Sequence, residues 1–218
     1  MPIISLVIFF LTALFFMVMV QVHLFEIAFT KLGLTPETTM LLVIGTLVGS
    51  GINLPLFELR TKQSGHLVLS PERKLIWELF QPAKEGKTIV AVNVGGCIIP
   101  VGLCFYFISL QLLEPISLLI ALSAITLLSY QSSRIIPNVG VGMPLFIAPL
   151  CAALLALVLA PEHPAQLAYV SGVLGVLIGA DVLRINEIGG LNAPIASIGG
   201  AGTFDGIFLT GIIAVLLA

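Results

Sequence analysis

The chain has 218 residues, of which 58% are hydrophobic and only 9% carry a charge, and its mean hydropathy is +1.16. In a soluble domain about a quarter of the residues are charged, and exposed apolar patches stay small. The composition therefore predicts an integral membrane protein, and it excludes a soluble enzyme, a nucleic-acid-binding protein and a disordered tail.

The uncharged stretches of the sequence predict the transmembrane helices. A spanning helix needs about 20 mostly apolar residues, because a charge at the bilayer centre costs at least about 2.5–3.5 kcal/mol. Seven stretches qualify: Pro2–Val22, Thr39–Phe57, Thr88–Leu113, Pro115–Gln131, Pro144–Ala160, Ala165–Arg184 and Gly199–Ala218. The first lacks a basic start and a cleavage site, so we expect a retained helix rather than a signal peptide. The predicted fold class is all-α, a polytopic transmembrane helical bundle of about seven spans in a single domain, residues 1–218.

One hydrophilic insert interrupts the bundle. Ten of the 20 charged residues lie between Glu58 and Lys87. Within this insert, Ser70 and Pro71 begin a predicted amphipathic helix that carries Trp77, the only tryptophan. This pattern favours a helix lying at the membrane interface as an anchor, rather than a binding site for a partner.

The basic residues predict the orientation, since cytoplasmic loops carry an excess of Lys and Arg. With a cytosolic N-terminus, eight of the nine basic residues fall in inner loops and only Lys31 lies outside. The eight are Arg60, Lys62, Arg73, Lys74, Lys84, Lys87, Arg134 and Arg184. We therefore expect a multi-pass protein of the cytoplasmic (inner) membrane, with its C-terminus outside.

The only two aspartates, Asp181 and Asp205, are predicted to be the catalytic residues. Gly206 to Ala218 is only 13 residues, about 20 Å of helix, whereas the hydrocarbon core is about 30 Å thick. We therefore expect the seventh helix to begin near Gly199 and to contain Asp205. Asp181 would then lie at a similar depth near the cytosolic end of the sixth helix.

Two neighbouring carboxyl groups can share a proton, so that one activates water while the other donates a proton. The same pair would serve as a proton or cation site in a transporter. Two structural alternatives compete with both functions. Asp205 could cap a helix N-terminus, and Asp181 could pair with Arg184 three residues further along the same helix.

A glycine-rich segment, Ile188–Gly202, joins the two acids. Irregular backbone at membrane depth is tolerated only where it is buried in protein or lines a cavity, so Gly189–Gly202 is predicted to border a substrate groove. Its expected substrate-binding residues are Gly199, Gly200, Gly202 and Thr203. A re-entrant segment, or an ion site made of exposed backbone amides, is also consistent with this composition. The alternative is a plain flexible hairpin on the cytosolic side.

The remaining signals indicate helix packing. Gly45–Gly49 and Gly175–Gly179 have the small-xxx-small spacing of closely packed helices, and hydrogen bonding between elements is the expected role of Asn53 and Asn93. We predict no metal site and no cofactor, because the cysteines and histidines are scattered. These are Cys97, Cys104, Cys151, His23, His66 and His163.

Four segments, Gly49–Leu56, Asn93–Gly96, Gly179–Asp181 and Ser197–Gly206, together resemble an uncharacterised family of prokaryotic multi-pass membrane proteins, domain of unknown function 1614. The likeness covers nearly the whole chain and implies no assigned activity. Asp181 and Asp205 also give a remoter resemblance to the GxGD-type aspartyl intramembrane proteases, whose acids lie on two successive helices near the cytosol. Phe204 stands in place of the second glycine of that motif, and no tyrosine precedes Asp181.

Three functions remain open from the sequence. The first is an intramembrane aspartyl protease-like hydrolase that cleaves a transmembrane peptide, surrounded by membrane lipids and binding no nucleic acid. The second is a small transporter or channel component that uses the acids for proton or cation coupling. The third is a membrane assembly subunit without chemistry of its own.

Overall fold

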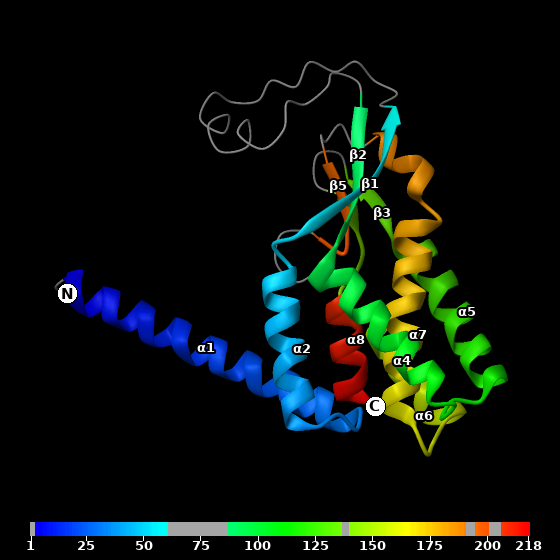
Figure 1. The fold of residues 1–218 in the computed structure, drawn as a ribbon, viewed down its shortest axis with the longest axis horizontal. Coiled ribbons are helices and arrows are strands. Elements are labelled where there is room, and N and C mark those ends of the chain that lie inside the picture. The colour runs from blue at the N-terminus through cyan, green and yellow to red at the C-terminus, as the bar shows by residue number, and fades with distance from the viewer. Residues whose placement is uncertain (1–2, 61–86, 137–139, 191–194, 201–205) are drawn as a thin grey trace.

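The computed structural model describes residues 3–60, 87–136, 140–190, 195–200 and 206–218 (Figure 1). The α-helices are α1 (Ile3–Lys31), α2 (Pro36–Gly49), α4 (Ile99–Ser109), α5 (Pro115–Ser132), α6 (Ile147–Leu159), α7 (Pro164–Val176) and α8 (Gly206–Leu217). Two π-helical segments, η2 (Val94–Ile98) and η3 (Leu177–Val182), and one 3-10 helix, η4 (Ile185–Gly190), adjoin them. The strands are β1 (Asn53–Arg60), β2 (Lys87–Asn93), β3 (Arg134–Ile136), β4 (Gly140–Gly142) and β5 (Ile195–Ile198). The described chain is mostly helical, as predicted.

Two of the helices that begin with proline, α5 and α7, follow the sequence prediction closely. Helix α5 begins at Pro115 and ends one residue beyond the predicted span, and α7 with η3 covers most of the predicted Ala165–Arg184 span. Proline is tolerated in the first turn because its missing N–H has no partner there in any helix. Among the described residues, two helical segments are long and apolar enough to cross a membrane, Pro115–Ser132 and Pro164–Glu187. Four shorter apolar helical segments in the described part of the chain have 10–17 residues, so the seven-span arrangement stays a prediction.

The packing of α5 and α6 places small side chains inside and large apolar side chains outside. In α6 the buried residues are Ala148, Pro149, Ala152, Ala153 and Ala156. The exposed side of the same helix carries Leu150, Leu154, Leu157 and Val158. In α5, Ser117, Ala121, Ile125 and Ser129 are buried while Ile116, Leu119 and Leu127 are exposed. Small residues at helix contacts with large apolar residues outside are typical of helices that pack in lipid.

The prediction of an all-α fold is wrong at one end of the bundle, where three strands form a sheet in the order β1-β2-β5. Strand β2 pairs antiparallel with β1 and parallel with β5. The predicted Thr39–Phe57 helix therefore ends at Gly49, and the first residues of the predicted Thr88–Leu113 helix form β2. A continuous apolar run cannot distinguish a buried strand from a buried helix, and Val90 and Thr88 are fully buried here.

The two ends of the predicted hydrophilic insert belong to the same sheet. The β1–β2 ladder continues to the pair Arg60 and Lys87, so the two ends of the predicted Glu58–Lys87 insert are held side by side. The predicted interfacial helix with Trp77 falls within residues 61–86, outside the described residues.

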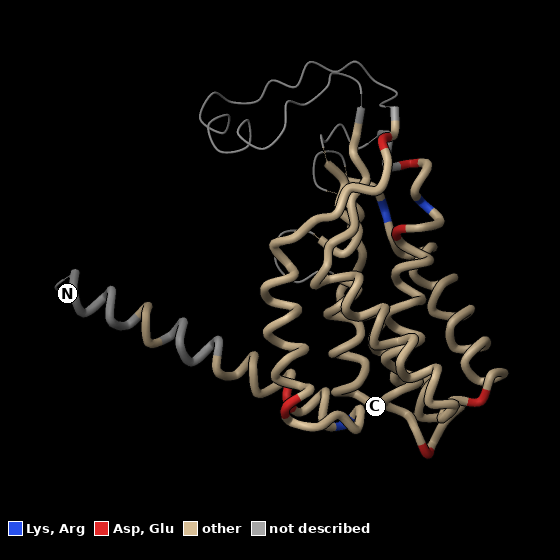
Figure 2. Tube along the Cα trace, in the orientation of Figure 1, with Lys and Arg blue, Asp and Glu red and all other residues tan. Residues whose placement is uncertain are grey.

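The charged residues gather at the two ends of the bundle, and its middle is uncharged (Figure 2). We call the end with the three-stranded sheet the sheet end and the opposite end, where α8 finishes, the C-terminal end. At the C-terminal end, the Lys31 ammonium donates to the carbonyls of Leu216 (3.1 Å) and Val215 (3.4 Å). A cation at this position stabilises the C-terminus of α8, because the last backbone carbonyls of a helix lack hydrogen-bond partners within it. In the first turn of α8, the ring of Phe208 meets that of Phe25 from α1 edge-on, with centroids 5.3 Å apart. Both contacts fasten α1 to α8.

Candidate functional site

Asp181 lies at the sheet end, in the π-helical segment η3 that continues α7. Its side chain is partly buried. π-helical turns are rare and occur often at functional sites. The other predicted catalytic residue, Asp205, and the predicted substrate-binding residues Gly202 and Thr203 lie outside the described residues. The described residue next to Asp205 in the sequence is Gly206, which begins α8 and serves below as the reference point for comparison with Asp181.

Helices α7 and α8 lie side by side and run antiparallel (Figure 1). A Cβ added to Gly172 would lie 3.3 Å from Thr210 Cγ2 and 3.7 Å from Ala214 Cβ. A Cβ added to Gly211 would lie 2.6 Å from Val173 Cγ2, so the two glycines let the helices approach closely. Because the two helices are antiparallel and Gly172 faces Thr210, Gly206, four residues before Thr210, lies level with a position about four residues after Gly172 on α7. Asp181 is about five residues, or about 7–8 Å, further along the same direction.

A second face of α7 and η3 packs against α5, as the spacing of Gly175 and Gly179 predicts. A Cβ at Gly175 would lie 2.6 Å from Ile125 Cγ2. One at Gly179 would lie 2.9 Å from Ser129 Cβ and would collide with the carbonyl oxygen of Thr126. Gly179 and Asp181 are two residues apart, about 200° around a helix, so the acid belongs to a different face from this contact.

Three segments that are distant in the sequence meet beside the start of η2, and we call this contact the polar junction. It consists of Ser50–Asn53, Asn93–Gly96 and Ser197–Gly200. The Asn93 side chain is only 1% exposed and its Nδ2 donates to the Ser50 carbonyl (2.7 Å) and to Asn53 Oδ1 (3.0 Å). Its Oδ1 accepts from the Gly96 amide (2.7 Å), and Ser197 Oγ donates to Asn53 Oδ1 (2.6 Å). The predicted packing role of both asparagines is confirmed.

Glycines close the polar junction because no side chain fits between its backbones. A Cβ at Gly49 would lie 2.9 Å from the Gly95 amide nitrogen, and a Cβ at Gly96 would overlap the carbonyl of Gly199. Gly199 has a φ of +75°, a conformation that residues with a Cβ rarely adopt. Gly199 and Gly200 therefore form a turn after β5, which contradicts the prediction that a helix begins near Gly199. Gly200 would place a Cβ 3.0 Å from Asn53 Oδ1, so these two predicted substrate-binding residues lie in the junction.

Arg184 fixes the chain beyond η3 to the end of α5. Its Nη2 donates to the Tyr130 carbonyl (2.7 Å), its Nε donates to Ser133 Oγ (2.7 Å), and its guanidinium lies 4.6 Å from the Tyr130 ring centroid. Its Nη1 also forms an ion pair with Glu187 Oε2 (3.0 Å). The Arg184 side chain is only 15% exposed, whereas its partners Glu187 and Tyr130 are partly open to water.

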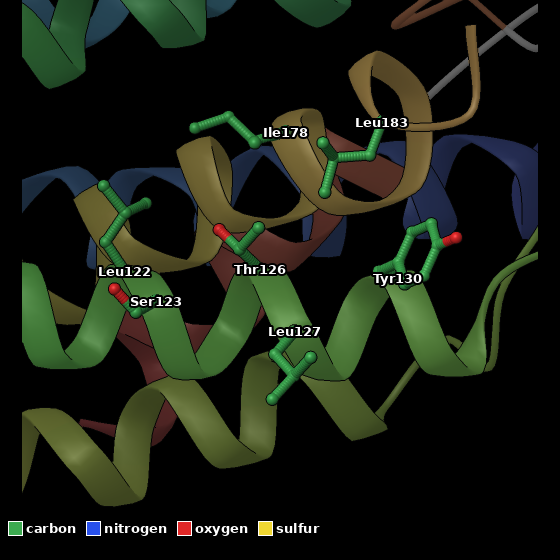
Figure 3. Close-up of a pocket in the computed structure, with 7 residues that line it drawn as sticks. All are labelled: Leu122, Ser123, Thr126, Leu127, Tyr130, Ile178 and Leu183. Atoms are coloured by element: carbon green, nitrogen blue, oxygen red, sulfur yellow. The ribbon is translucent and has the colours of Figure 1, made fainter. Parts of the chain in front are cut away.

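A groove of about 340 Å³, which we call the α5–η3 groove, lies on the outside of this contact (Figure 3). Its lining residues are Leu122, Ser123, Thr126, Leu127 and Tyr130 from α5, with Ile178 and Leu183 opposite them. Ile178 and Leu183 bracket Asp181 in the sequence, but Asp181 is not one of the residues that line the groove. The groove is therefore an apolar feature next to the acid-bearing turn.

The sequence did not predict that Ser50–Asn53, Asn93–Gly96 and Ser197–Gly200 would meet. The signal was nevertheless present, because each segment combines glycine with asparagine or serine at the end of an apolar run. Where backbones approach closely, glycine leaves room for the contact, and polar side chains form hydrogen bonds with the backbone groups that meet there.

Comparison with known protein families finds a match over most of the chain. A family model described as "Protein of unknown function (DUF1614)" matches residues 47–217. The match covers most of the chain, and the chain belongs to this family. It includes the polar junction and both aspartates. No curated protein and no solved structure matches the chain.

Proposed function

We propose that this family member is a multi-pass protein of the cytoplasmic membrane whose sheet end faces the cytosol, and that Asp181 and Asp205 form an acid–base pair for intramembrane peptide hydrolysis. The observation that carries the proposal is the close antiparallel packing of α7 and α8, because η3 continues α7 as far as Asp181 and α8 begins at the residue that follows Asp205 in the sequence.

The distribution of charge supports the membrane location and the orientation. The described helices α4, α5, α6, α7 and α8 contain no Lys, Arg, Asp or Glu, and α4, α5 and α6 carry large exposed apolar side chains such as Phe105, Leu119 and Leu154. Arg134 and Arg184 lie at the sheet end, whereas Lys31 contacts the last turn of α8 at the other end. The excess of basic residues on one side is what the positive-inside rule expects of the cytosolic face.

The chemistry follows from two carboxyl groups that share one proton. The ionised carboxylate takes a proton from a water molecule, whose oxygen attacks the carbonyl carbon of the peptide bond. The protonated carboxyl group then donates its proton to the departing amine nitrogen. The two carboxyl groups thereby exchange protonation states, and the peptide bond is cleaved with the addition of one water molecule.

The polar junction supports a peptide as the substrate. Asn53 is exposed, and its amide nitrogen has no hydrogen-bond partner among the described residues. It lies beside Gly200, from which the chain continues through Asp205 to α8. Strand β5 is also an edge strand of the sheet, so its outer side offers backbone N–H and C=O groups to an extended chain.

The experiment measures cleavage of helical membrane peptides by the purified chain in lipid vesicles. The proposal expects cleavage by the natural sequence, and loss of cleavage with Asp181→Asn and with Asp205→Asn. Glu187→Gln is the matched control, because it neutralises a half-exposed acid at the same end of the molecule. No cleavage by the natural sequence, or equal cleavage by the aspartate variants, would overturn the hydrolase.

Proton or cation coupling is the second candidate, and buried hydroxyl groups favour it. Thr39, Thr46, Ser129 and Thr210 have buried hydroxyls without a hydrogen-bond partner among the described residues. Such groups inside a bundle can bind an ion or water. This function predicts flux driven by a pH gradient across vesicles and its loss with Asp205→Asn. If both aspartate variants remain fully functional in cells while enlargement of Gly175 abolishes function, the chain is a non-catalytic assembly subunit.

A further inference from the structure

A second cavity lies at the sheet end, and we call it the Arg134 pocket. It has a volume of about 520 Å³ and lies where α5 ends, the β3–β4 hairpin begins and the chain turns into α6. Its lining residues are Gln131, Ser132, Arg134, Ile136, Gly142, Met143 and Pro144. A guanidinium and two neutral polar side chains thus share one cavity with apolar side chains.

The charge of Arg134 is not balanced within the described part of the chain. Arg134 is exposed, and no ion pair or side-chain hydrogen bond forms between it and another described residue. It is also the only charged residue in the sequence between Glu114 and Glu162. Arg184, at the same end, has both an ion pair, with Glu187, and a largely buried side chain. The pocket therefore offers five N–H donors and a positive charge to a ligand.

The pocket opens next to an apolar stripe on α6. Pro144 lines the pocket, and two residues later Phe146 begins a row of exposed side chains on one side of the helix: Phe146, Leu150, Leu154 and Val158. The first is 66% exposed and the last 78% exposed. The row extends over 12 residues, about 18 Å, slightly more than the roughly 15 Å of one hydrocarbon leaflet. An anion-binding group at the sheet end is thus followed by an apolar surface one leaflet long.

We propose that the Arg134 pocket binds the phosphate group of an anionic phospholipid of the cytosolic leaflet, whose acyl chain lies along the apolar stripe of α6. The inference rests on the membrane location and orientation given under the proposed function, and it is independent of the aspartate chemistry. Arg134 pairs with the phosphate, and Gln131 donates to a phosphate or glycerol oxygen. The partner is a lipid rather than a soluble phosphate because the anion-binding group and the apolar stripe adjoin.

The test uses the purified full chain in vesicles of phosphatidylcholine alone or of equal parts phosphatidylcholine and phosphatidylglycerol. The relative affinity of the two lipids is measured by displacement of fluorescent phosphatidylglycerol. A hydrogen bond between charged groups contributes about 1.5–3 kcal/mol, so loss of the guanidinium–phosphate pair in Arg134→Gln is expected to weaken the preference for phosphatidylglycerol at least about tenfold. Arg134→Lys should restore most of it. Lys84→Gln, which removes the same charge from the hydrophilic insert, should leave it unchanged.

Three results would overturn the inference. The first is an equal loss of preference in Arg134→Gln and Lys84→Gln, which would indicate general surface charge. The second is an affinity for phosphatidylcholine equal to that for phosphatidylglycerol in the natural sequence. The third is displacement of the lipid by inorganic phosphate alone. A chain that alkaline carbonate extracts from vesicles would instead refute the proposed membrane location, and absence of peptide cleavage would refute only the hydrolase.

Discussion

Asn93→Ala is expected to destabilise the protein strongly, because one buried side chain holds the polar junction together. The substitution removes three hydrogen bonds, to the Ser50 carbonyl, to Asn53 Oδ1 and from the Gly96 amide. The Gly96 amide is buried, so it is left without a partner, which costs about 1–3 kcal/mol. The loss of the other two bonds adds about 1 kcal/mol, for a total of about 3 kcal/mol.

This energy converts into a measurable change in thermal stability. For a chain of this size, 1 kcal/mol corresponds to about 2–4 °C in Tm, so the expected decrease is about 6–12 °C. Cys97 and Cys104 are buried, so unfolding in detergent can be followed by their reaction with a thiol-specific fluorophore. The partly exposed Cys151 is replaced by alanine in every variant to remove its background reaction.

Asn53→Ala is the matched control. Asn53 takes part in the same network but is exposed, so water can replace its two hydrogen bonds, and we expect a loss of about 1 kcal/mol or less. Equal Tm values for the two variants, or a decrease below about 2 °C for Asn93→Ala, would refute the reasoning that burial makes Asn93 the anchor of the junction.

Three further predictions use the same unfolding assay. Gly179→Ala should lower Tm by at least the equivalent of about 1–3 kcal/mol, because the added Cβ collides with the backbone of α5. Gly102→Ala should be neutral or stabilising, because no atom lies within 4 Å of the added Cβ. Equal effects of the two substitutions would contradict the packing of α5 against η3. Arg184→Ala should cost about 2–3 kcal/mol, because the Tyr130 carbonyl and the Ser133 hydroxyl each lose one charged donor. Glu187→Gln should cost less than about 1 kcal/mol, because that ion pair is half-exposed. A larger effect of Glu187→Gln would assign the stabilisation to the ion pair instead. Gly199→Ala should cost at least about 1–2 kcal/mol, because alanine is strained at a φ of +75° and its Cβ would lie 2.6 Å from Cys97 Cβ. An unchanged Tm would mean that the turn after β5 can rearrange.

The candidate site was only partly predictable from the sequence. The rarity of aspartate identified Asp181, and the spacing of Gly175 and Gly179 identified the face of its helix that packs against α5. The partners of Asn93 were not predictable, because Ser50, Asn53 and Gly96 are joined to it by backbone geometry at a junction of three elements. The network around Arg184 was missed for a similar reason. Its main acceptors, Tyr130 and Ser133, lie more than 50 residues away in the sequence.

The sequence by itself determined the mostly helical class, the charge-free middle of the bundle and the limits of helices such as α5. Local composition controls these features, since proline at a helix start and an uncharged apolar run act over a few residues. Only the tertiary structure decided that Asn53–Arg60, Lys87–Asn93 and Ile195–Ile198 form one sheet. A parallel pair such as β2 and β5 joins residues 106 positions apart, as Ile89 and Ile195 show, so no local sequence pattern indicates it. An apolar run such as Thr88–Asn93 fits either a buried strand or a helix, and here its neighbours made it a strand.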